Sequence, residues 1–493
     1  MRASLCDLSK ITVISPESLN DLDIFVAYPA LEPILQTYIT YDAEEVLKRS
    51  EIIGKLSTQD ISLVSDLVKV REELSRCLKE LKKQQRPLME YSFLFYALEA
   101  YLRSVDIAAQ LLPLAEPEEV SIFYANVKET VTKVCEAITP PKNVTLAVNI
   151  SESGMPLQMG ITNIESNAID VVGVLGKNKT GINSLCDAAS VSSRSAHGYL
   201  ETYIHDQIEK QWGTALNSAL RLMRKIDINH LLEWAEWLKP MELYYTGLVV
   251  MNSLREHGAN LCRPAPLAFG SYAKKTKVKS MLYPHLVFCR KEVQAQDFGF
   301  NHGDIVMITG ANSAGKTSVV KAYAQNCIFA QLGFWVTADS FEFTPFKQWN
   351  TVFAAGEDEK IKLSRFQLEA ERMKLATATS NSETCLILNE PFTSTNPTEA
   401  AELLCDIIAE ENKKGVTVIL VTHIFDIHKM LLEQNYSVRS YVMGKDYVAE
   451  EKPPDGISQA RQLADMYGFS IKNLIPDENE AKVLEDYMWR FSE

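Results

Sequence analysis

The sequence predicts a protein of several domains, in which a mostly α-helical part with a small β insertion is followed by an α/β domain. Three observations support this prediction. An apolar seam with helical spacing runs through residues 63–81, two alternating apolar segments lie near residue 150, and a strand–loop–helix pattern begins at residue 304. The 493 residues are enough for about two to four domains.

The composition excludes several classes of protein. Hydrophobic residues make up 46% of the chain and charged residues 23%, which is ordinary for a globular protein. An apolar run of about 18 residues, which would predict a transmembrane helix, is not found. The nine cysteines form no CxxC pair, so neither a zinc site nor a disulfide framework is expected. With no apparent secretion signal either, we expect a cytoplasmic protein without membrane association.

The helical part is expected at residues 46–265, after an N-terminal segment of residues 1–45. Its seam is spaced 4-3-4-3-4, which is typical of a long helix that packs along one side. The seam consists of Leu63, Leu67, Val70, Leu74, Cys77 and Leu81. A second long helical stretch is expected at about 198–257, and the prolines of CRPAPLAFG (262–270) mark the next domain boundary.

The β insertion is expected near the middle of the helical part. Apolar residues alternate along one segment, and the alternation resumes after the turn-like SESGMP, which predicts a hairpin. The alternating residues are Val144, Leu146, Val148 and Ile150, then Leu157, Met159 and Ile161. Residues 166–196 are rich in Ser, Asn, Gly and Ala and are expected to form a loop.

The second domain, expected at residues 266–470, carries a phosphate-binding sequence. DIVMITGANSAGKTSVVKAYAQNCIF (304–329) reads as a short strand, a loop of small residues and a long helix, and the loop is a Walker A motif. Backbone amides of such a loop surround phosphate oxygens, its Lys reaches the β- and γ-phosphates, and its Thr offers a hydroxyl to Mg²⁺. We therefore expect an α/β P-loop NTPase domain that binds ATP and Mg²⁺, rather than a simple glycine turn. The expected ligand-binding residues are Gly310, Asn312, Ser313, Ala314, Gly315, Lys316, Thr317 and Ser318.

A second apolar segment, TCLILNEPFTS (384–394), resembles a Walker B strand and is expected beside the P-loop strand. Its first polar residue would hold Mg²⁺ and its second would polarise the attacking water. The first is Asn389, an amide where a carboxylate is usual, and the second is Glu390. We expect Asn389 to be a weak metal ligand beside Thr317 and Glu390 to be catalytic, so that ATP hydrolysis is slow and needs much Mg²⁺. The alternative is a core strand that ends at a surface Glu.

A third apolar segment, VTVILVTH (416–423), ends in His423, which we expect near the γ-phosphate as a second catalytic residue. A structural histidine at a strand end is the alternative.

Further segments follow in a fixed order. After TGANSAGKTS come LGFWVTADSFEFTPFKQW (332–349), LSRFQLEAERM (363–373), LILNEPFTSTNPTEA (386–400), VTHIFDI (421–427) and KPPDGISQARQLADMYGF (452–469). Together, residues 300–470 resemble the ABC-like ATPase domain of the MutS family of DNA mismatch repair proteins. Ala311 replaces the Pro of that family's loop, and Arg365 replaces the Thr of its STFxxE signature.

The resemblance implies a homodimer with two composite nucleotide sites, each completed by the other subunit. The signature and trans-acting residues would be Ser364, Phe366, Glu369, Ser394, Thr395 and Asn396. It also implies that the helical part is a lever and clamp core, with the clamp-like insertion at about 140–197, and that residues 471–493 form a helical tail. The Phe-x-Glu triplet that reads mismatches in this family is not found in residues 1–270.

These expectations define the leading hypothesis, a clamp-type, ATP-dependent DNA-binding protein of repair or recombination that does not itself read mismatches. An ATPase that acts on ribosomes or another ribonucleoprotein, and a nucleotide-gated module with little turnover, are the alternatives. Because the net charge is −14, any DNA binding would have to use a local basic surface. Contacts of the expected clamp would be to phosphates, and they would therefore not be sequence-specific. Lys177, Lys179, Arg194 and His197 lie in or beside the expected clamp tip. For Lys274, Lys275, Lys277 and Lys279 we favour a solvated loop.

Overall fold

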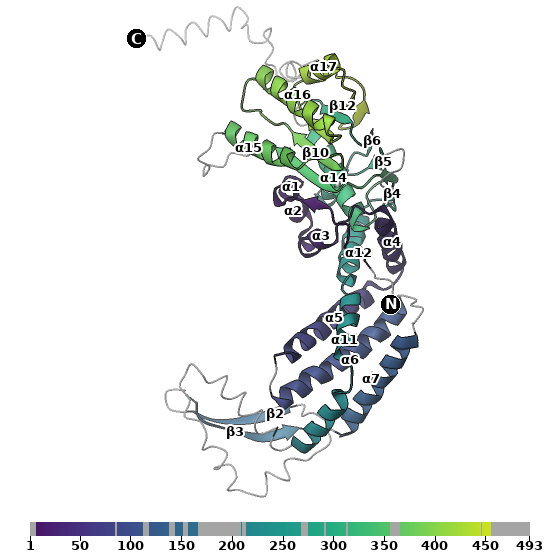
Figure 1. Ribbon diagram of the computed structural model, residues 1–493, viewed down its shortest axis with the longest axis vertical. Coiled ribbons are helices and arrows are strands. Elements are labelled where there is room, and N and C mark those ends of the chain that lie inside the picture. Colours follow the sequence, from purple (N-terminus) through teal and green to yellow (C-terminus); the bar gives the residue numbers. More distant parts are fainter. Residues whose placement is uncertain are drawn as a thin grey trace, which may run out of the picture. The chain divides into compact units, whose positions relative to one another are not determined.

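The computed structural model describes residues 6–83, 86–111, 118–137, 143–150, 156–165, 209, 213–267, 275–289, 292–311, 314–354, 365–444 and 446–454. They belong to two compact units (Figure 1). The helical unit lies within residues 56–245, and the α/β unit combines residues 6–55 with those from 246 onward. Within these ranges no helix is both long and apolar enough to cross a membrane.

Several predictions fall outside the described residues. They concern Asn312, Ser313, Ser364, Lys274, the loop of residues 166–196 with the basic residues in or beside it, and the tail of residues 471–493.

Helices dominate the first unit, as predicted. The apolar seam forms a buried face of α5, where Leu67, Val70, Leu74 and Cys77 are all buried, while Leu63 and Leu81 at its ends are half-buried. Asp60 caps this helix, because its side chain accepts a hydrogen bond from the Ser62 amide at 2.9 Å. The helices here are α5 (Ile61–Leu81), α6 (Pro87–Leu111), α7 (Glu118–Ala137) and α11 (Ile228–Trp237).

The predicted hairpin is confirmed. Strands β2 (Asn143–Ile150) and β3 (Pro156–Glu165) pair antiparallel, with Leu146 opposite Ile161 and Val148 opposite Met159. The second helical stretch is divided in its described part into a helix at 213–223, α11 and α12 (Met241–Glu256). The breaks have local causes, since Asp227 caps the start of α11 and Pro240, which has no amide hydrogen, precedes α12.

The α/β unit is built on a seven-stranded sheet, which confirms the predicted α/β class. Its strand order is β1-β9-β10-β11-β7-β12-β13, and every neighbouring pair is parallel except β12 with β13. The central strands β7 and β11 are buried along their whole length and mostly apolar, because both faces of the sheet are covered by other elements. The strands are β1 (Val13–Ile14), β7 (Ile305–Thr309), β9 (Gln348–Phe353), β10 (Thr384–Asn389), β11 (Thr417–Val421), β12 (Val438–Met443) and β13 (Ala449–Glu451).

Four helices connect these strands. Helix α14 is buried along almost its whole length, whereas α16 and α17 bury one apolar side against β7, β10 and β11. The helices are α14 (Lys316–Leu332), α15 (Arg365–Ala378), α16 (Pro397–Lys413) and α17 (Asp426–Glu433).

A smaller four-stranded sheet in the same unit has the order β4-β8-β5-β6. Strand β5 contains Lys275, Lys277 and Lys279, so our expectation of a solvated loop is wrong for these three residues. Thr276 and Val278 alternate with them and are buried, which fixes this segment as a strand. The elements are β4 (Ala265–Pro266), β5 (Lys275–Met281), β6 (Gln296–Asn301), β8 (Ser340–Phe343) and the short helix α13 (Pro284–Cys289).

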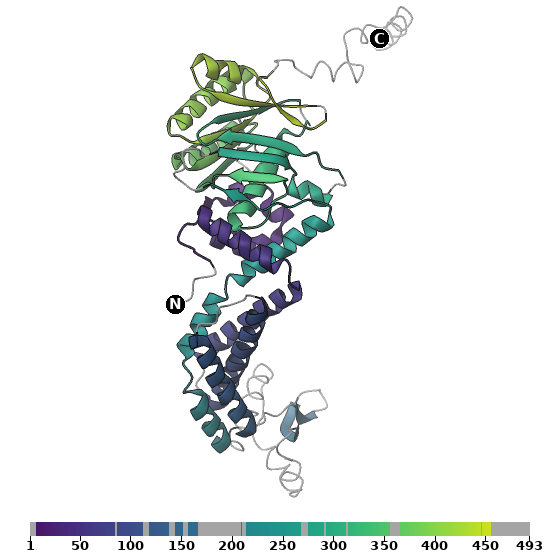
Figure 2. The same ribbon diagram turned by 90° about the vertical axis from the view of Figure 1, so that its right-hand side faces the viewer.

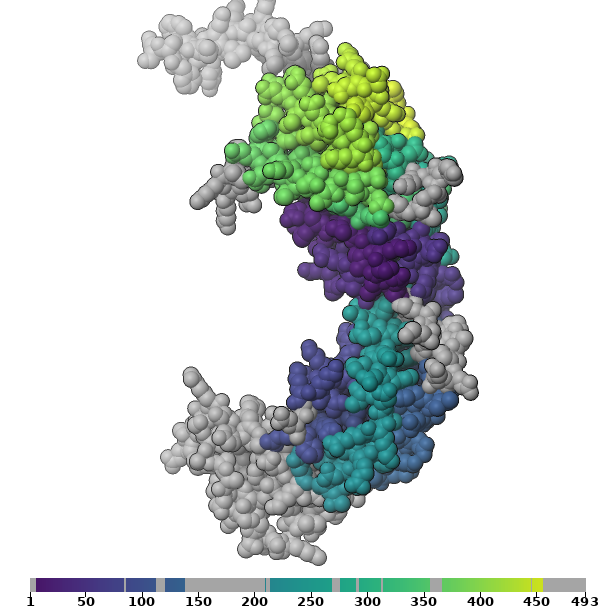
Figure 3. All heavy atoms as spheres, in the orientation of Figure 1, coloured from purple at the N-terminus to yellow at the C-terminus, as the bar shows by residue number. Residues whose placement is uncertain are grey.

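The N-terminal segment is an integral part of the α/β unit. Strand β1 extends the large sheet at β9, with Val13 opposite Gln348, and the purple N-terminal residues lie against the teal and green ones in every view (Figures 1, 2 and 3). The buried Gln331 joins the two parts, because its amide donates to Thr12 Oγ1 at 2.7 Å and to the Thr40 carbonyl at 3.0 Å. The helices of this segment are α1 (Pro16–Asp21), α2 (Ile24–Ala27), α3 (Glu32–Tyr38) and α4 (Ala43–Leu56).

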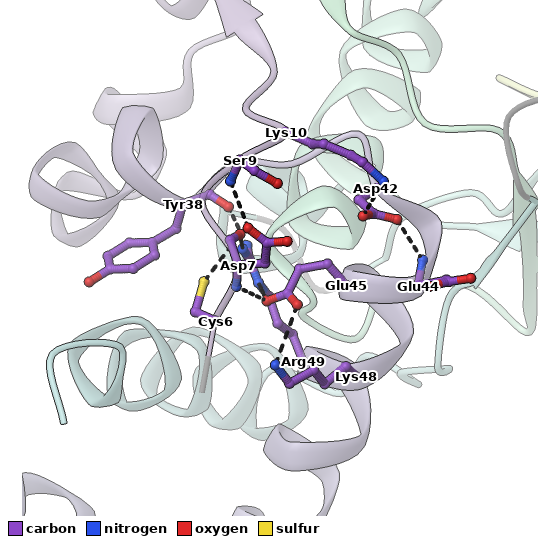
Figure 4. Close-up of polar contacts among 10 residues, drawn as sticks. All are labelled: Cys6, Asp7, Ser9, Lys10, Tyr38, Asp42, Glu44, Glu45, Lys48 and Arg49. Carbon is purple, nitrogen blue, oxygen red and sulfur yellow. Dashed lines mark hydrogen bonds and ion pairs between the residues drawn. The ribbon is translucent and has the colours of Figure 1, made fainter. Parts of the chain in front are cut away.

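A buried ion pair supports this segment (Figure 4). Arg49 Nε donates to Glu45 Oε1 at 2.7 Å, and the two side chains are 1% and 5% exposed. The guanidinium also donates to the backbone carbonyls of Tyr38 and Asp7. Gly333, at φ +88°, lies against Arg49, where a Cβ atom would clash with the Arg49 side chain. The position therefore requires glycine on both grounds.

Candidate nucleotide-binding site

The polar residues predicted from the sequence follow the carboxyl ends of three strands. Gly310 directly follows β7, Asn389 is the last residue of β10 and Glu390 comes next, and His423 lies two residues after β11. Parallel strands bring their carboxyl ends to one edge of a sheet, where ligands commonly bind. The expected pairing of β10 with β7 is wrong, because β11 lies between them. All three strands are short, apolar and buried, so sequence order alone could not predict their order in the sheet.

Two glycines shape the loop of residues 310–315. Gly310 has φ +146°, and a Cβ atom there would lie 2.8 Å from Met443 Cβ on the neighbouring strand β12. Gly315 has φ +91° and immediately precedes the first turn of α14. Both conformations suit glycine, and they start α14 with its amino end at the loop. Such an end provides backbone amides and a partial positive charge for a phosphate.

Lys316 is the first residue of α14 and points back into the loop. Its side chain is 4% exposed, and its ammonium lies 3.0 Å from the carbonyl oxygens of both Gly310 and Ala311. The same ammonium lies 3.2 Å from Glu390 Oε1. These three oxygens fix the position of the buried ammonium, which places a positive charge where an anion bound at the loop would lie.

Thr317 and Asn389 meet beside this lysine. Thr317 Oγ1 donates to Asn389 Oδ1 at 2.9 Å, and Asn389 is 9% exposed. These two uncharged oxygens suit Mg²⁺, which prefers oxygen ligands and is usually bound by few protein groups together with the phosphates of a nucleotide. Among the described residues, no cluster of His, Cys, Asp and Glu could hold a metal ion by itself.

The loop of residues 390–396 has a strained backbone. Glu390 and Phe392 have φ +49° and +59°, which is costly for residues other than glycine. Helix α15 packs on this loop, because the rings of Phe366 and Phe392 lie 5.6 Å apart and Ser394 Oγ lies 3.5 Å from Glu369 Oε2. The predicted signature residues Phe366 and Glu369 thus contact the loop of their own chain.

The other predicted site residues lie around Lys316 and Asn389 and have no described hydrogen bond to either. His423 is exposed two residues beyond the end of β11, whereas Thr422 between them is buried. Thr395 is half-buried near Glu399, with 3.4 Å between their side-chain oxygens. Asn396 caps α16 by accepting from the Thr398 amide at 2.9 Å. Ala314 directly precedes Gly315, and Ser318 lies in the first turn of α14.

A cavity of about 530 Å³ opens beside the loop, and the sequence did not predict it. Gly315 and Ser318 line it together with the side chains of Tyr283 and Tyr447. Gln296 fixes the turn that carries Tyr447, because its amide donates to the Tyr447 carbonyl at 2.7 Å and its Oε1 accepts from the Ala449 amide at 2.9 Å. A partly apolar cavity with aromatic walls next to a phosphate loop has the character of a site for a base. Neither tyrosine lies in a motif, so only the structure could find them.

These features define an α/β domain with a candidate nucleotide site at the edge of a parallel sheet. Residues 306–465 match the family model of MutS domain V. This part of the chain is therefore similar to domain V of the MutS family.

Three relatives illustrate the similarity. MutS protein homolog 4 of Candida albicans is 23% identical over 228 residues, which are 44% of this chain and 28% of that protein. DNA-binding protein MutS2 of Pyrococcus furiosus is 33% identical over 133 residues, 26% of this chain and 22% of that protein. Endonuclease MutS2 of Thermotoga neapolitana is 30% identical over 172 residues, 33% of this chain and 22% of that protein. The chain therefore spans less than a third of each of these relatives.

Proposed function

We propose that this protein is an ATP-dependent DNA-binding protein of the MutS type, which hydrolyses ATP slowly and does not itself read mismatches. The observation that carries the proposal is a pair of contacts between the start of α14 and the end of β10: Lys316 with Glu390 at 3.2 Å, and Thr317 with Asn389 at 2.9 Å. The match of residues 306–465 to MutS domain V supports the same assignment.

Each residue of the site would have a different role in ATP hydrolysis. Backbone amides of the Walker A segment and the Lys316 ammonium would bind the phosphates, while Thr317 and Asn389 would hold Mg²⁺. The bound ion would neutralise charge on the β- and γ-phosphate oxygens. Glu390 leaves the Lys316 ammonium when phosphates arrive, and its carboxylate then orients the attacking water. His423, exposed two residues beyond the end of β11, would contact the γ-phosphate.

A homodimer completes the site in this proposal. Phe366 is 39% exposed on α15, although its ring also contacts Phe392. The exposed side of this helix and the loop of residues 392–396 would reach the nucleotide of the second subunit. The expected lever and clamp core of residues 46–265, with its hairpin β2–β3, would then surround DNA and hold it through phosphates.

A second function is favoured by one observation. Asn389 stands where a carboxylate would hold Mg²⁺ more strongly, which suits a nucleotide-gated binding module with little turnover. An ATPase that acts on a ribonucleoprotein remains the third candidate.

One panel of measurements separates the three. Binding of the full chain to matched duplex, a G·T mismatch, a four-way junction and purified ribosomes is measured with and without ATP, at two salt concentrations. The proposal predicts ATP-dependent junction binding that falls steeply with salt, no preference for the mismatch, and slow hydrolysis. Preference for ribosomes would support the third candidate, and ATP-dependent binding without hydrolysis would support the second. A clear preference for the mismatch would contradict the proposal.

A further inference from the structure

The short segment Asp21–Leu22–Asp23 lies between α1 and α2 and contacts both helices that lead to the nucleotide site. Its first carboxylate faces α15 and β9. Asp21 Oδ2 accepts from Arg372 Nη2 at 2.6 Å and from Thr351 Oγ1 at 2.6 Å. Arg372 Nη1 also donates to the Phe353 carbonyl at 3.0 Å, so the guanidinium is held at both ends.

The other end of the segment faces α14. The Leu22 carbonyl accepts from Gln325 Nε2 at 2.9 Å, and Asp23 Oδ2 forms an ion pair with Lys321 Nζ. Figure 1 shows the purple helices α1 and α2 beside the green α14 and α15. One three-residue segment thus links two helices that are far apart in the sequence.

The contacts of Asp21 and Leu22 are largely removed from water, whereas the Asp23 side chain is 35% exposed. The side chains of Asp21 and Arg372 are 13% and 22% exposed, and Leu22 and Gln325 are fully buried. Charged hydrogen bonds in such surroundings are stronger and less screened by salt than surface ion pairs. Asp23 has φ +55°, a conformation that Asp tolerates better than most residues and that turns the chain from α15 toward α14.

Each anchor point lies about one helical turn from a residue of the site. Lys321 follows Thr317 by four residues on α14, and Arg372 follows Glu369 by three residues on α15. Glu369 in turn contacts Ser394 of the loop that carries Glu390. A shift of α15 relative to α14 would therefore move this loop relative to Lys316.

We propose that residues 21–23 form a clasp that sets the position of α15 against α14, and that Asp21 is a positioning residue for ATP hydrolysis. This inference rests on the proposed function. Because the Asp21 carboxylate contacts α15 and β9 rather than α14, its loss should slow hydrolysis without weakening nucleotide binding.

The first test compares Asp21→Asn with Asp42→Asn in the full chain. Asp42 belongs to the same N-terminal segment, but its carboxylate pairs with the exposed Lys10 at 2.7 Å and accepts from the Glu44 amide at 3.1 Å (Figure 4). We expect Asp21→Asn to lower kcat about tenfold, within the usual range of coupling between sites, and to leave the Kd for ATP within about twofold. Asp42→Asn should change neither. Equal kcat in the two variants, or a parallel loss of ATP affinity, would overturn the proposal.

The second test needs no hydrolysis. Amide hydrogen exchange is measured without nucleotide in wild type, Asp21→Asn, Asp42→Asn and Arg372→Lys, which keeps the charge but loses the forked geometry. The clasp predicts faster exchange in residues 365–378 and 390–396 for Asp21→Asn and Arg372→Lys alone. Unchanged exchange there would refute the clasp even if the protein hydrolyses ATP. Faster exchange in a protein that hydrolyses no ATP would instead keep the clasp and reject the enzymatic function.

Discussion

The ammonium of Lys316 lies 3.2 Å from the carboxylate of Glu390. The same ammonium also donates to the backbone carbonyls of Gly310 and Ala311. The residue expected to bind phosphate is thus paired with the residue expected to activate water. Phosphate and carboxylate are both anions, so they compete for the same ammonium.

The pair makes a prediction about Glu390→Gln. Loss of the carboxylate should stop hydrolysis, and it should also strengthen binding of ADP, because the ammonium becomes available. We expect the binding free energy of ADP to become more favourable by about 1 kcal/mol, which lowers its Kd about fivefold, as measured by titration calorimetry. Glu402→Gln, on the exposed side of α16, is the matched control and should leave ADP affinity unchanged. Weaker ADP binding in Glu390→Gln would contradict this competition.

Asn389→Asp should restore the missing charge at the metal site. A carboxylate beside the Thr317 hydroxyl attracts a divalent ion far more strongly than an amide oxygen does. The Mg²⁺ concentration for half-maximal hydrolysis should fall about tenfold, and turnover should rise. The control Asn435→Asp adds the same charge at an exposed position with φ +64°, which Asp tolerates. If wild type and Asn389→Asp both fail to hydrolyse ATP at high Mg²⁺, the nucleotide-gated module becomes the better account.

Self-association tests the composite site. With a non-hydrolysable ATP analogue, sedimentation velocity at micromolar protein should show a dimer. Phe366→Ala should weaken that dimer about tenfold without loss of nucleotide affinity, because aromatic residues often dominate interfaces. Tyr96→Ala, which truncates an exposed aromatic residue of the helical unit, is the control. A wild-type protein that stays monomeric with the analogue would rule out the composite site.

The buried pair of Arg49 and Glu45 makes a prediction about stability. Arg49→Met leaves the Glu45 carboxylate and two backbone carbonyls without their buried donor, at a cost of about 3–5 kcal/mol in the free energy of unfolding. Lys48→Met removes the other, 40% exposed cation beside the same carboxylate and should cost less than about 0.5 kcal/mol. Urea unfolding of both variants measures the difference. Similar losses in the two would show that burial of the pair contributes little.

Local patterns predicted the parts of the site well. The Walker A motif predicted a strand, a loop and a helix at 304–329, and the structure has the strand β7 and the helix α14 there. Alternation predicted the hairpin β2–β3 because a strand repeats every two residues. These features depend on residues that are close together in the sequence, so a local pattern is enough to predict them.

Long-range relationships could not be predicted in the same way. The sequence showed no partner for residues 1–45, yet β1 pairs with β9 and Asp21 contacts Arg372. The placement of β11 between β10 and β7 depends on which buried strands pair, and apolar composition does not distinguish them. Tyr283 and Tyr447 line the same cavity although they are far apart in the sequence, so the fold and not a local pattern brings them together.

The central claim is that nucleotide binds at Lys316, and equilibrium binding of MgATP to wild type and Lys316→Ala tests it most directly. Both proteins are first compared by circular dichroism and urea unfolding, so that only folded protein is titrated. We predict saturable binding of one nucleotide per chain to wild type and none to Lys316→Ala, because the loop amides alone hold phosphates poorly without the buried ammonium. Equal affinity of the two folded proteins for MgATP would contradict the account.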